Sequence, residues 1–239
     1  INPKEFEFEF ELNLKKPDFL TDFLVDDLTR FELTNCRLKY IDRDDLLLGN
    51  VSIPVMEYKQ ILFKDMALNV DARADSAITA LTIETVSVDT TQIRNIELSS
   101  VFKLQEARMK FSINDGLDKL KYNLEAYATY SDSIYMLRIL PDMAIFNYLP
   151  WHVIDDNRIE LSGRNLSAMG TEMSNGLQKI ALKASGESIG LELEHFKINN
   201  LTGIFEMDTS VRWIRGEING HLGMDNVMSR PTFEVDLTI

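Results

Sequence analysis

Apolar residues alternate with polar ones in short stretches along the whole chain. The clearest stretch is residues 6–14, Phe-Glu-Phe-Glu-Phe-Glu-Leu-Asn-Leu. Because successive side chains of a strand point to opposite faces, this segment would carry three Phe and two Leu on one side. Three Glu and an Asn would lie on the other. The pattern predicts a β-sheet with one apolar face and one acidic, solvated face.

Comparable stretches recur about every 10 to 15 residues, with turn residues between them. Asn114-Asp115-Gly116 is a strong turn signal between two of them. No long helical pattern separates the stretches, so an antiparallel meander is expected rather than βαβ units. The expected strands are residues 6–14, 31–41, 47–55, 61–72, 79–88, 93–104, 108–113, 120–129, 158–162, 177–185, 188–194, 196–199, 203–211, 215–222 and 232–239.

Two segments depart from the alternation. Residues 17–28 carry apolar side chains at helical spacing and early acidic residues, which predicts a short helix. Residues 134–149 are too densely apolar for an exposed strand, and Pro141 would break an interior helix. We therefore expect two short helical turns there, ended by Pro150. They are interpreted as a plug over an apolar sheet face, or as a hydrophobic lid or partner contact.

The expected fold is mainly β: an elongated, curled antiparallel sheet, forming an open trough or a half-open sandwich, with one or two short helices. Residues 1–239 would form one extended β-rich segment, divided near 134–150 by the short helical insertion. The chain begins at Ile1 without a Met and ends inside an alternating run. We therefore expect it to be a segment of a longer protein.

Composition narrows the possible partners. The 239 residues carry a formal net charge of −13, which phosphate backbones repel, so no nucleic-acid partner is expected. Cys36 is the only cysteine, which excludes an intramolecular disulfide and a cysteine-based metal site. No apolar run is long enough for a transmembrane helix.

No catalytic or metal-binding pattern is present in the sequence. The three histidines, His152, His195 and His221, are not spaced as metal ligands. Adjacent acidic pairs such as Asp44-Asp45 would point to opposite faces of a strand, and no nucleophile or phosphate-binding motif occurs. We expect no enzyme activity, no catalytic residues, no metal and no cofactor. A hydrolase with carboxylates assembled from distant strands is the least favoured alternative.

The stretch from Leu33 to Asp42 contains Asn-x-x-Leu-x-Tyr-x-Asp, which resembles the N-x-x-[VIL]-x-Y-x-D strand of AsmA-like proteins, including the TamB group. Residues 140–150, with Leu-Pro and Asn-Tyr-Leu-Pro, and residues 159–166 are similar too, with a Bacteroidetes-like character. The resemblance spans most of the chain.

The resemblance implies a periplasmic location, an inner-membrane anchor outside this chain, and a long β-sheet with an apolar groove. It also implies phospholipid transport between inner and outer membranes, or outer-membrane protein assembly. The implied partners are phospholipid acyl chains and, through parts absent from this chain, an outer-membrane insertase barrel. No catalytic residue carries over.

The function favoured by the sequence is therefore a non-enzymatic periplasmic bridge segment whose apolar face shields acyl chains. The alternative is a β-sandwich glycan- or protein-binding module of the cell envelope, with Trp151 or Trp213 exposed at a loop end. The candidates for the apolar groove are Phe6, Phe8, Phe10, Leu12, Leu68, Val70, Tyr122, Leu124, Leu191 and Leu193.

Overall fold

The computed structural model describes residues 6–14, 25, 27–141, 143–205 and 215–239. The protein is mainly β and antiparallel, as the alternation predicted, with 74% of residues in strands. The chain folds into two compact units. The first comprises Ile1–Leu104, Phe111–Lys119 and Phe205–Asp208, and the second comprises Gln105–Lys110, Leu120–Ile204 and Thr209–Ile239. Strand β7 (Glu106–Asn114) contributes residues to both.

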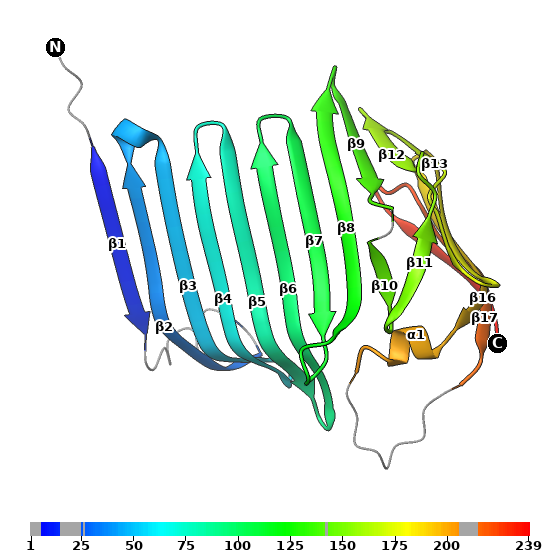
Figure 1. Cartoon of the computed structure of the whole chain (residues 1–239), viewed down its shortest axis with the longest axis horizontal. Helices are drawn as coiled ribbons and strands as arrows, with labels where there is room; N and C mark the ends of the chain where they lie inside the picture. The colour runs from blue at the N-terminus through cyan, green and yellow to red at the C-terminus, as the bar shows by residue number, and fades with distance from the viewer. Residues whose placement is uncertain (1–5, 15–24, 26, 142, 206–214) are drawn as a thin grey trace. The chain divides into compact units, whose positions relative to one another are not determined.

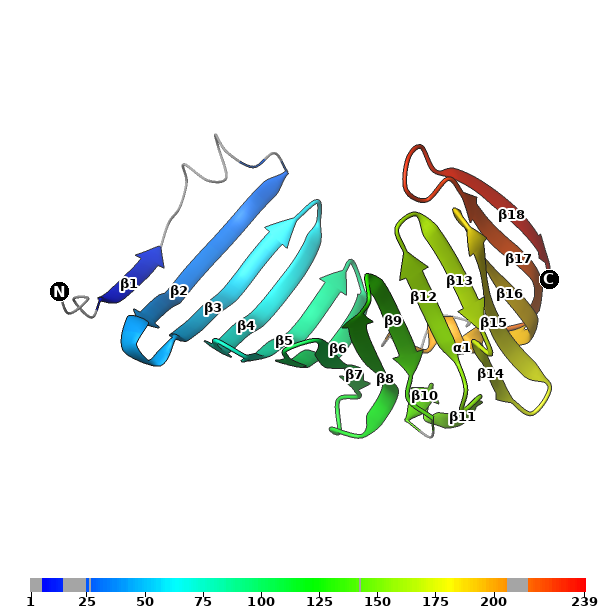
Figure 2. The same ribbon diagram turned by 90° about the horizontal axis from the view of Figure 1, so that it is seen from above.

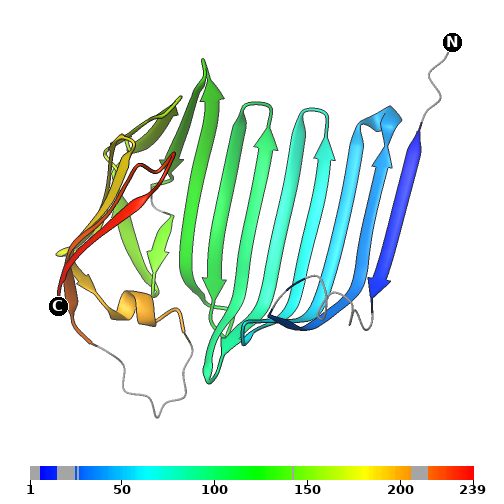
Figure 3. The ribbon, with the colours of Figure 1, turned by 180° about the vertical axis from the view of Figure 1, so that it is seen from behind.

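The first unit contains a meander in which each strand pairs antiparallel with the next one in the chain (Figures 1 and 3). Short turns connect the second to sixth strands, and turns of this kind fix the pairing register of the strands they join. A 3-10 turn at Asp42–Asp44 connects the second and third strands. The strands are β1 (Glu7–Leu14), β2 (Leu28–Ile41), β3 (Leu46–Tyr58), β4 (Ile61–Arg73), β5 (Ser76–Val88) and β6 (Thr91–Lys103).

A line of bending crosses strands β3–β6 near one end, where Figure 1 shows them curving. The register places Pro54, Asp65, Glu84 and Asn95 side by side along this line. Asp65 and Asn95 have positive φ angles of 51° and 48°, the left-handed conformation typical of strand bulges. The Asn95 side chain donates to the Asp115 carbonyl oxygen at 3.0 Å and to Asp118 Oδ1 at 3.2 Å. These contacts fix the bend at the β6 end.

The second unit is also a meander, in which several long strands are interrupted part-way (Figure 2). Strand β8 pairs with both β9 and β10; β11 pairs with β10, and β12 with β9. In the same way β13 pairs with β12 and β15, and β14 pairs with β11 and β15. The strands are β8 (Leu120–Ser131), β9 (Ile134–Ile139), β10 (Ala144–Phe146), β11 (Leu149–Val153), β12 (Arg158–Ser162), β13 (Asn165–Met169), β14 (Glu172–Asn175), β15 (Gln178–Gly186), β16 (Ser188–Lys197), β17 (Glu217–Asp225) and β18 (Thr232–Thr238).

Buried Asn157 ties two of these interruptions together. Its Nδ2 donates to the carbonyl oxygens of Ile139 at 2.8 Å and Ile154 at 2.6 Å. Its Oδ1 accepts from the Ile139 amide at 2.7 Å. Backbone groups left unpaired where the strands break are thereby satisfied, as buried polar groups require.

The helical turns expected at 134–149 are not present, and this prediction was wrong. The segment forms β9 and β10 and the start of β11 instead. Pro141 lies in the gap between β9 and β10, where a missing amide costs no ladder hydrogen bond. The apolar density arises because β10 packs into the core: Ala144 is buried there and Phe146 contacts it.

The other expected helix, at 17–28, falls largely outside the described residues, and Leu28 already begins β2. The strand expected at 203–211 also lies mostly outside them. Before it, Asn199–Thr202 forms the short helix α1.

The core of the second unit gathers around aromatic rings. Trp151 lies 5.3 Å from Phe146 and 6.0 Å from Phe196 between ring centroids. Tyr122 contacts Phe146 edge-on, and its hydroxyl donates to the Asn200 carbonyl oxygen of α1 at 2.9 Å. These contacts hold α1 on the core. The buried members of the cluster are Ala144, Trp151, Val153, Ile180, Leu193 and Phe196.

Candidate functional site: an exposed apolar face on the first unit

One face of the β1–β6 meander is apolar across all six strands. In an antiparallel pair, directly opposite residues share a face, so the register defines rows that cross the sheet. One row is Leu12, Cys36, Val51, Leu68, Leu81 and Leu98. The next is Phe10, Leu38, Gly49, Val70, Thr79 and Ser100. A third is Phe8, Tyr40, Leu47, Ala72, Ala77 and Phe102.

This apolar face is exposed. The six large side chains Phe8, Phe10, Leu38, Leu68, Leu98 and Phe102 are each between 38% and 48% exposed. A second layer packed on the face would bury such side chains almost completely. A contiguous exposed apolar surface of this kind is typical of a binding site.

The polar groups on this face are engaged or lie at its rim. Thr79 Oγ1 and Ser100 Oγ hydrogen-bond each other at 2.6 Å. The Tyr40 hydroxyl donates to Asp45 Oδ1 at 3.4 Å, at the turn that ends the strand. The polar groups on this face are therefore few and largely bonded within the protein, which suits a hydrocarbon ligand.

The opposite face of the same sheet is polar. Lys39 Nζ lies 2.6 Å from Glu7 Oε1, and Arg37 Nε donates to Glu9 Oε1 at 2.7 Å. These hydrogen bonds raise the pKa of Lys39 and of Arg37. The two ion pairs confirm that the glutamates of β1 face solvent together, as the alternation predicted.

Amide side chains continue this polar face. Asn35 Nδ2 donates to Asn50 Oδ1 at 2.5 Å, and Asn50 Nδ2 donates to Asn69 Oδ1 at 2.6 Å. A shallow hollow of about 490 Å³ lies beside this ladder and exposes Leu48 and Ile78. The two faces therefore differ sharply in chemistry, although each carries some exposed apolar side chains.

The sequence-predicted groove residues divide between the two units. Phe8, Phe10, Leu12, Leu68 and Val70 lie on the apolar face of the first unit. Phe6 immediately precedes β1 and is exposed.

The remaining four candidates lie in the second unit. Tyr122 and Leu193 are buried in its core, and Leu124 and Leu191 pack against the core cluster. In this conformation these four side chains stabilise the fold.

Most positions of this face are not among the candidates chosen from the sequence. Leu38, Leu47, Leu81, Leu98 and Phe102 belong to the rows but were not selected. Their strands do alternate, as in Ile96, Leu98, Ser100 and Phe102. However, the alternation is masked by apolar residues on the other face, such as Leu48 and Ile78, so the pairing register was needed to assign them.

The histidines and tryptophans are placed separately. His195 Nδ1 lies 3.1 Å from Glu217 Oε2 in an exposed pair, and His221 and His152 lie on other strands. The described residues contain no group of three or more His, Cys, Asp or Glu side chains suited to a metal. Trp151 is 1% exposed and is therefore a core residue, while Trp213 lies outside the described residues.

Within the part of the chain that the structure describes, no helix has the length and hydropathy to cross a membrane. In comparisons with known proteins, no family model, curated protein or solved structure matches this chain.

Proposed function

We propose that the apolar face of β1–β6 binds the acyl chains of phospholipids and that the protein acts without catalysis. The observation that carries the proposal is the exposed, laterally continuous apolar face, whose Thr79 and Ser100 hydroxyls hydrogen-bond each other. Catalysis would require converging reactive groups, whereas shielding hydrocarbon requires only area.

The dimensions of the face suit an acyl chain. Neighbouring strands lie about 4.8 Å apart, so six strands span roughly 24 Å. The hydrocarbon core of a bilayer is about 30 Å thick, or about 15 Å for the chains of one leaflet. Each methylene removed from water contributes about 0.8 kcal/mol, so a chain lying on this face would be held without any polar anchor.

The resemblance to AsmA-like and TamB-type proteins supports phospholipid as the source of the acyl chain. On this proposal the protein is a periplasmic bridge segment between inner and outer membranes, anchored through a region outside this chain. An insertase barrel would be met through other parts of the protein.

Introducing negative charge on one face tests the proposal. A Leu68→Asp, Leu98→Asp double variant would place two carboxylates in one row of this face, on either side of Leu81. The matched control is Leu48→Asp, Ile78→Asp, which adds the same charge to exposed apolar positions on the opposite face. Binding would be measured by titration with a fluorescent fatty acid, after circular dichroism has shown that both variants fold.

We expect the face variant to bind the probe at least about tenfold more weakly, because hydrocarbon would have to desolvate two carboxylates. The control should bind like the unaltered protein. Equal affinity of the folded face variant and the control would rule out this face as the acyl site.

A further inference from the structure

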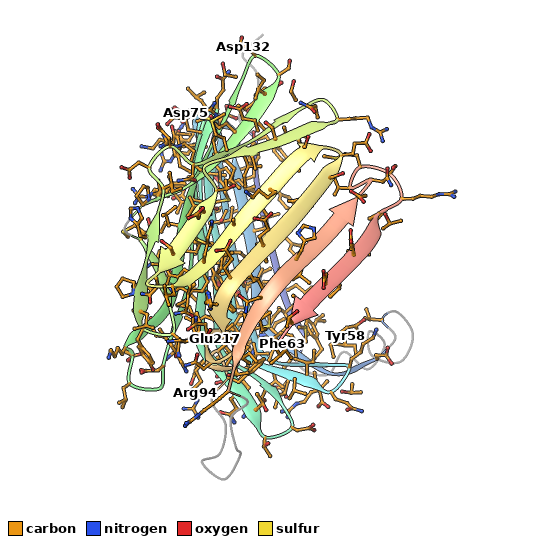
Figure 4. All side chains as sticks on the ribbon, turned by 90° about the vertical axis from the view of Figure 1, so that its right-hand side faces the viewer. Tyr58, Phe63, Asp75, Arg94, Asp132 and Glu217 are labelled. Atoms are coloured by element: carbon orange, nitrogen blue, oxygen red, sulfur yellow. The ribbon has the colours of Figure 1, made fainter. Side chains whose placement is uncertain are left out.

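Strand β18 is paired on one side only among the described residues. It pairs antiparallel with β17 from Asn219↔Thr238 to Asp225↔Thr232. All seven of its residues are exposed, and Figure 4 shows it, in red, at the border of the strands of its unit. About half of the backbone N–H and C=O groups of such a strand point away from its partner and can pair with another strand.

One side of β18 extends an apolar surface. Phe233 and Val235 are 74% and 67% exposed, and they lie opposite Met224 and Leu222 of β17. Leu222 in turn lies opposite Leu191, which contacts the core. Apolar side chains therefore continue from the core across β17 to β18, where Phe233 and Val235 are exposed.

The other side of β18 carries two carboxylates, Glu234 and Asp236. Neither forms an ion pair within the described part of the chain. Opposite them on β17 are Gly223 and His221. The His221 ring lies over Gly190 and Gly223, which have no side chains to exclude it. No lysine or arginine of β17 faces these acids.

Strand β1 has the same alternation of acidic and apolar residues, but its glutamates pair with cationic side chains of the neighbouring strand. There, β2 supplies Lys39 to Glu7 and Arg37 to Glu9, with Leu38 between them on the apolar side. The β1–β2 pair therefore shows which kind of strand complements an acidic, alternating strand in this protein.

We propose that β18 is a docking edge for an extended polypeptide segment in which Lys or Arg alternates with apolar residues. Its cations would face Glu234 and Asp236, and its apolar residues would continue the surface of Phe233 and Val235. A second copy of this chain fits less well. Its exposed strands β1 and β18 would bring Glu7, Glu9 and Glu11, or a second Glu234 and Asp236, against these acids.

The edge also lacks the usual obstacles to strand addition. Its sequence, Thr-Phe-Glu-Val-Asp-Leu-Thr, contains no Lys and no Pro, and its register with β17 has no bulge. The acidic side chains are the remaining deterrent, and they repel only acidic partners. This proposal is independent of the acyl-binding face on the first unit.

Two synthetic heptapeptides, Lys-Val-Lys-Val-Lys-Val-Lys and Glu-Val-Glu-Val-Glu-Val-Glu, would test the proposal on the full chain. Binding is measured by titration, and the site by amide hydrogen exchange. The lysine peptide should bind and protect amides within 232–238, and the glutamate peptide should not. In a Glu234→Lys, Asp236→Lys variant the preference should invert, with the lysine peptide weakened about tenfold, because two attractive cross-strand pairs become repulsive.

Several results would overturn the assignment. These are equal binding of both peptides, an unchanged preference in the charge-reversed variant, no binding of either peptide, or protection confined to strands other than β18. Concentration-dependent self-association through β18 would also overturn it, because the occupant of the edge would then be a second copy of the chain and not a basic strand. The charge-reversed residues are exposed, so the variant should remain folded, which circular dichroism would verify.

Discussion

At the scale of single residues, Tyr122 shows why alternation could not separate groove from core. It was selected as a groove candidate because it alternates with Leu124, and the structure buries it beneath α1. Alternation assigns a side chain to a face, but what covers that face depends on residues far away in sequence. Asn200, which accepts the Tyr122 hydroxyl, is separated from it by 78 positions.

Burial raises the pKa of the Tyr122 hydroxyl, with a smaller contribution from Tyr148. An unfolded tyrosine ionises near pH 10, so the folded state holds this proton more tightly. The stability gained in this way is complete below pH 10 and is lost as the pH rises through the folded value.

Tyr122→Phe should therefore lower the free energy of unfolding by about 1 kcal/mol at pH 7, because one hydrogen bond is lost. The difference from the unaltered protein should shrink above pH 10. Denaturant unfolding followed by tryptophan fluorescence would measure this difference. A difference that stays constant from pH 7 to pH 11 would contradict the account.

At the scale of strands, the alternating pattern was a good guide wherever a strand was continuous. The expected strand at 61–72 corresponds to β4, Ile61–Arg73, and that at 79–88 lies within β5, Ser76–Val88. The pattern failed at 134–149 because the strand is divided there into β9 and β10, and β10 packs in the core. Apolar density with a central proline is common to a broken strand and to paired helical turns, so only the pairing of β9 and β10 with β8 decides between them.

The bend across β3–β6 yields a prediction at this scale. Asp65 needs a left-handed conformation that a β-branched residue tolerates poorly. Asp65→Val should destabilise the first unit by about 1–2 kcal/mol. Glu84→Val, at the neighbouring position of the same line, should cost less than about 0.5 kcal/mol, because β5 has no positive φ there.

Hydrogen exchange of the β4 and β5 amides would measure both variants. If Asp65→Val and Glu84→Val lower protection equally, the left-handed residue is not what shapes the bend.

At the scale of the whole molecule, the two units use the same meander differently. The second packs its apolar side chains around Trp151, whereas the first leaves a six-stranded apolar face exposed. The Phe/Glu alternation of residues 6–14 predicted an apolar face on one strand, and the pairing register shows that five further strands continue this face. Burying such a surface on a ligand is favourable in proportion to the area removed from water.

The most direct test of acyl binding is native mass spectrometry of the chain purified from bacteria without added lipid. The account predicts co-purifying phospholipid on the unaltered protein and on the Leu48→Asp, Ile78→Asp control. It predicts little or none on the folded Leu68→Asp, Leu98→Asp variant. A lipid-free unaltered protein, or equal phospholipid on both variants, would contradict it.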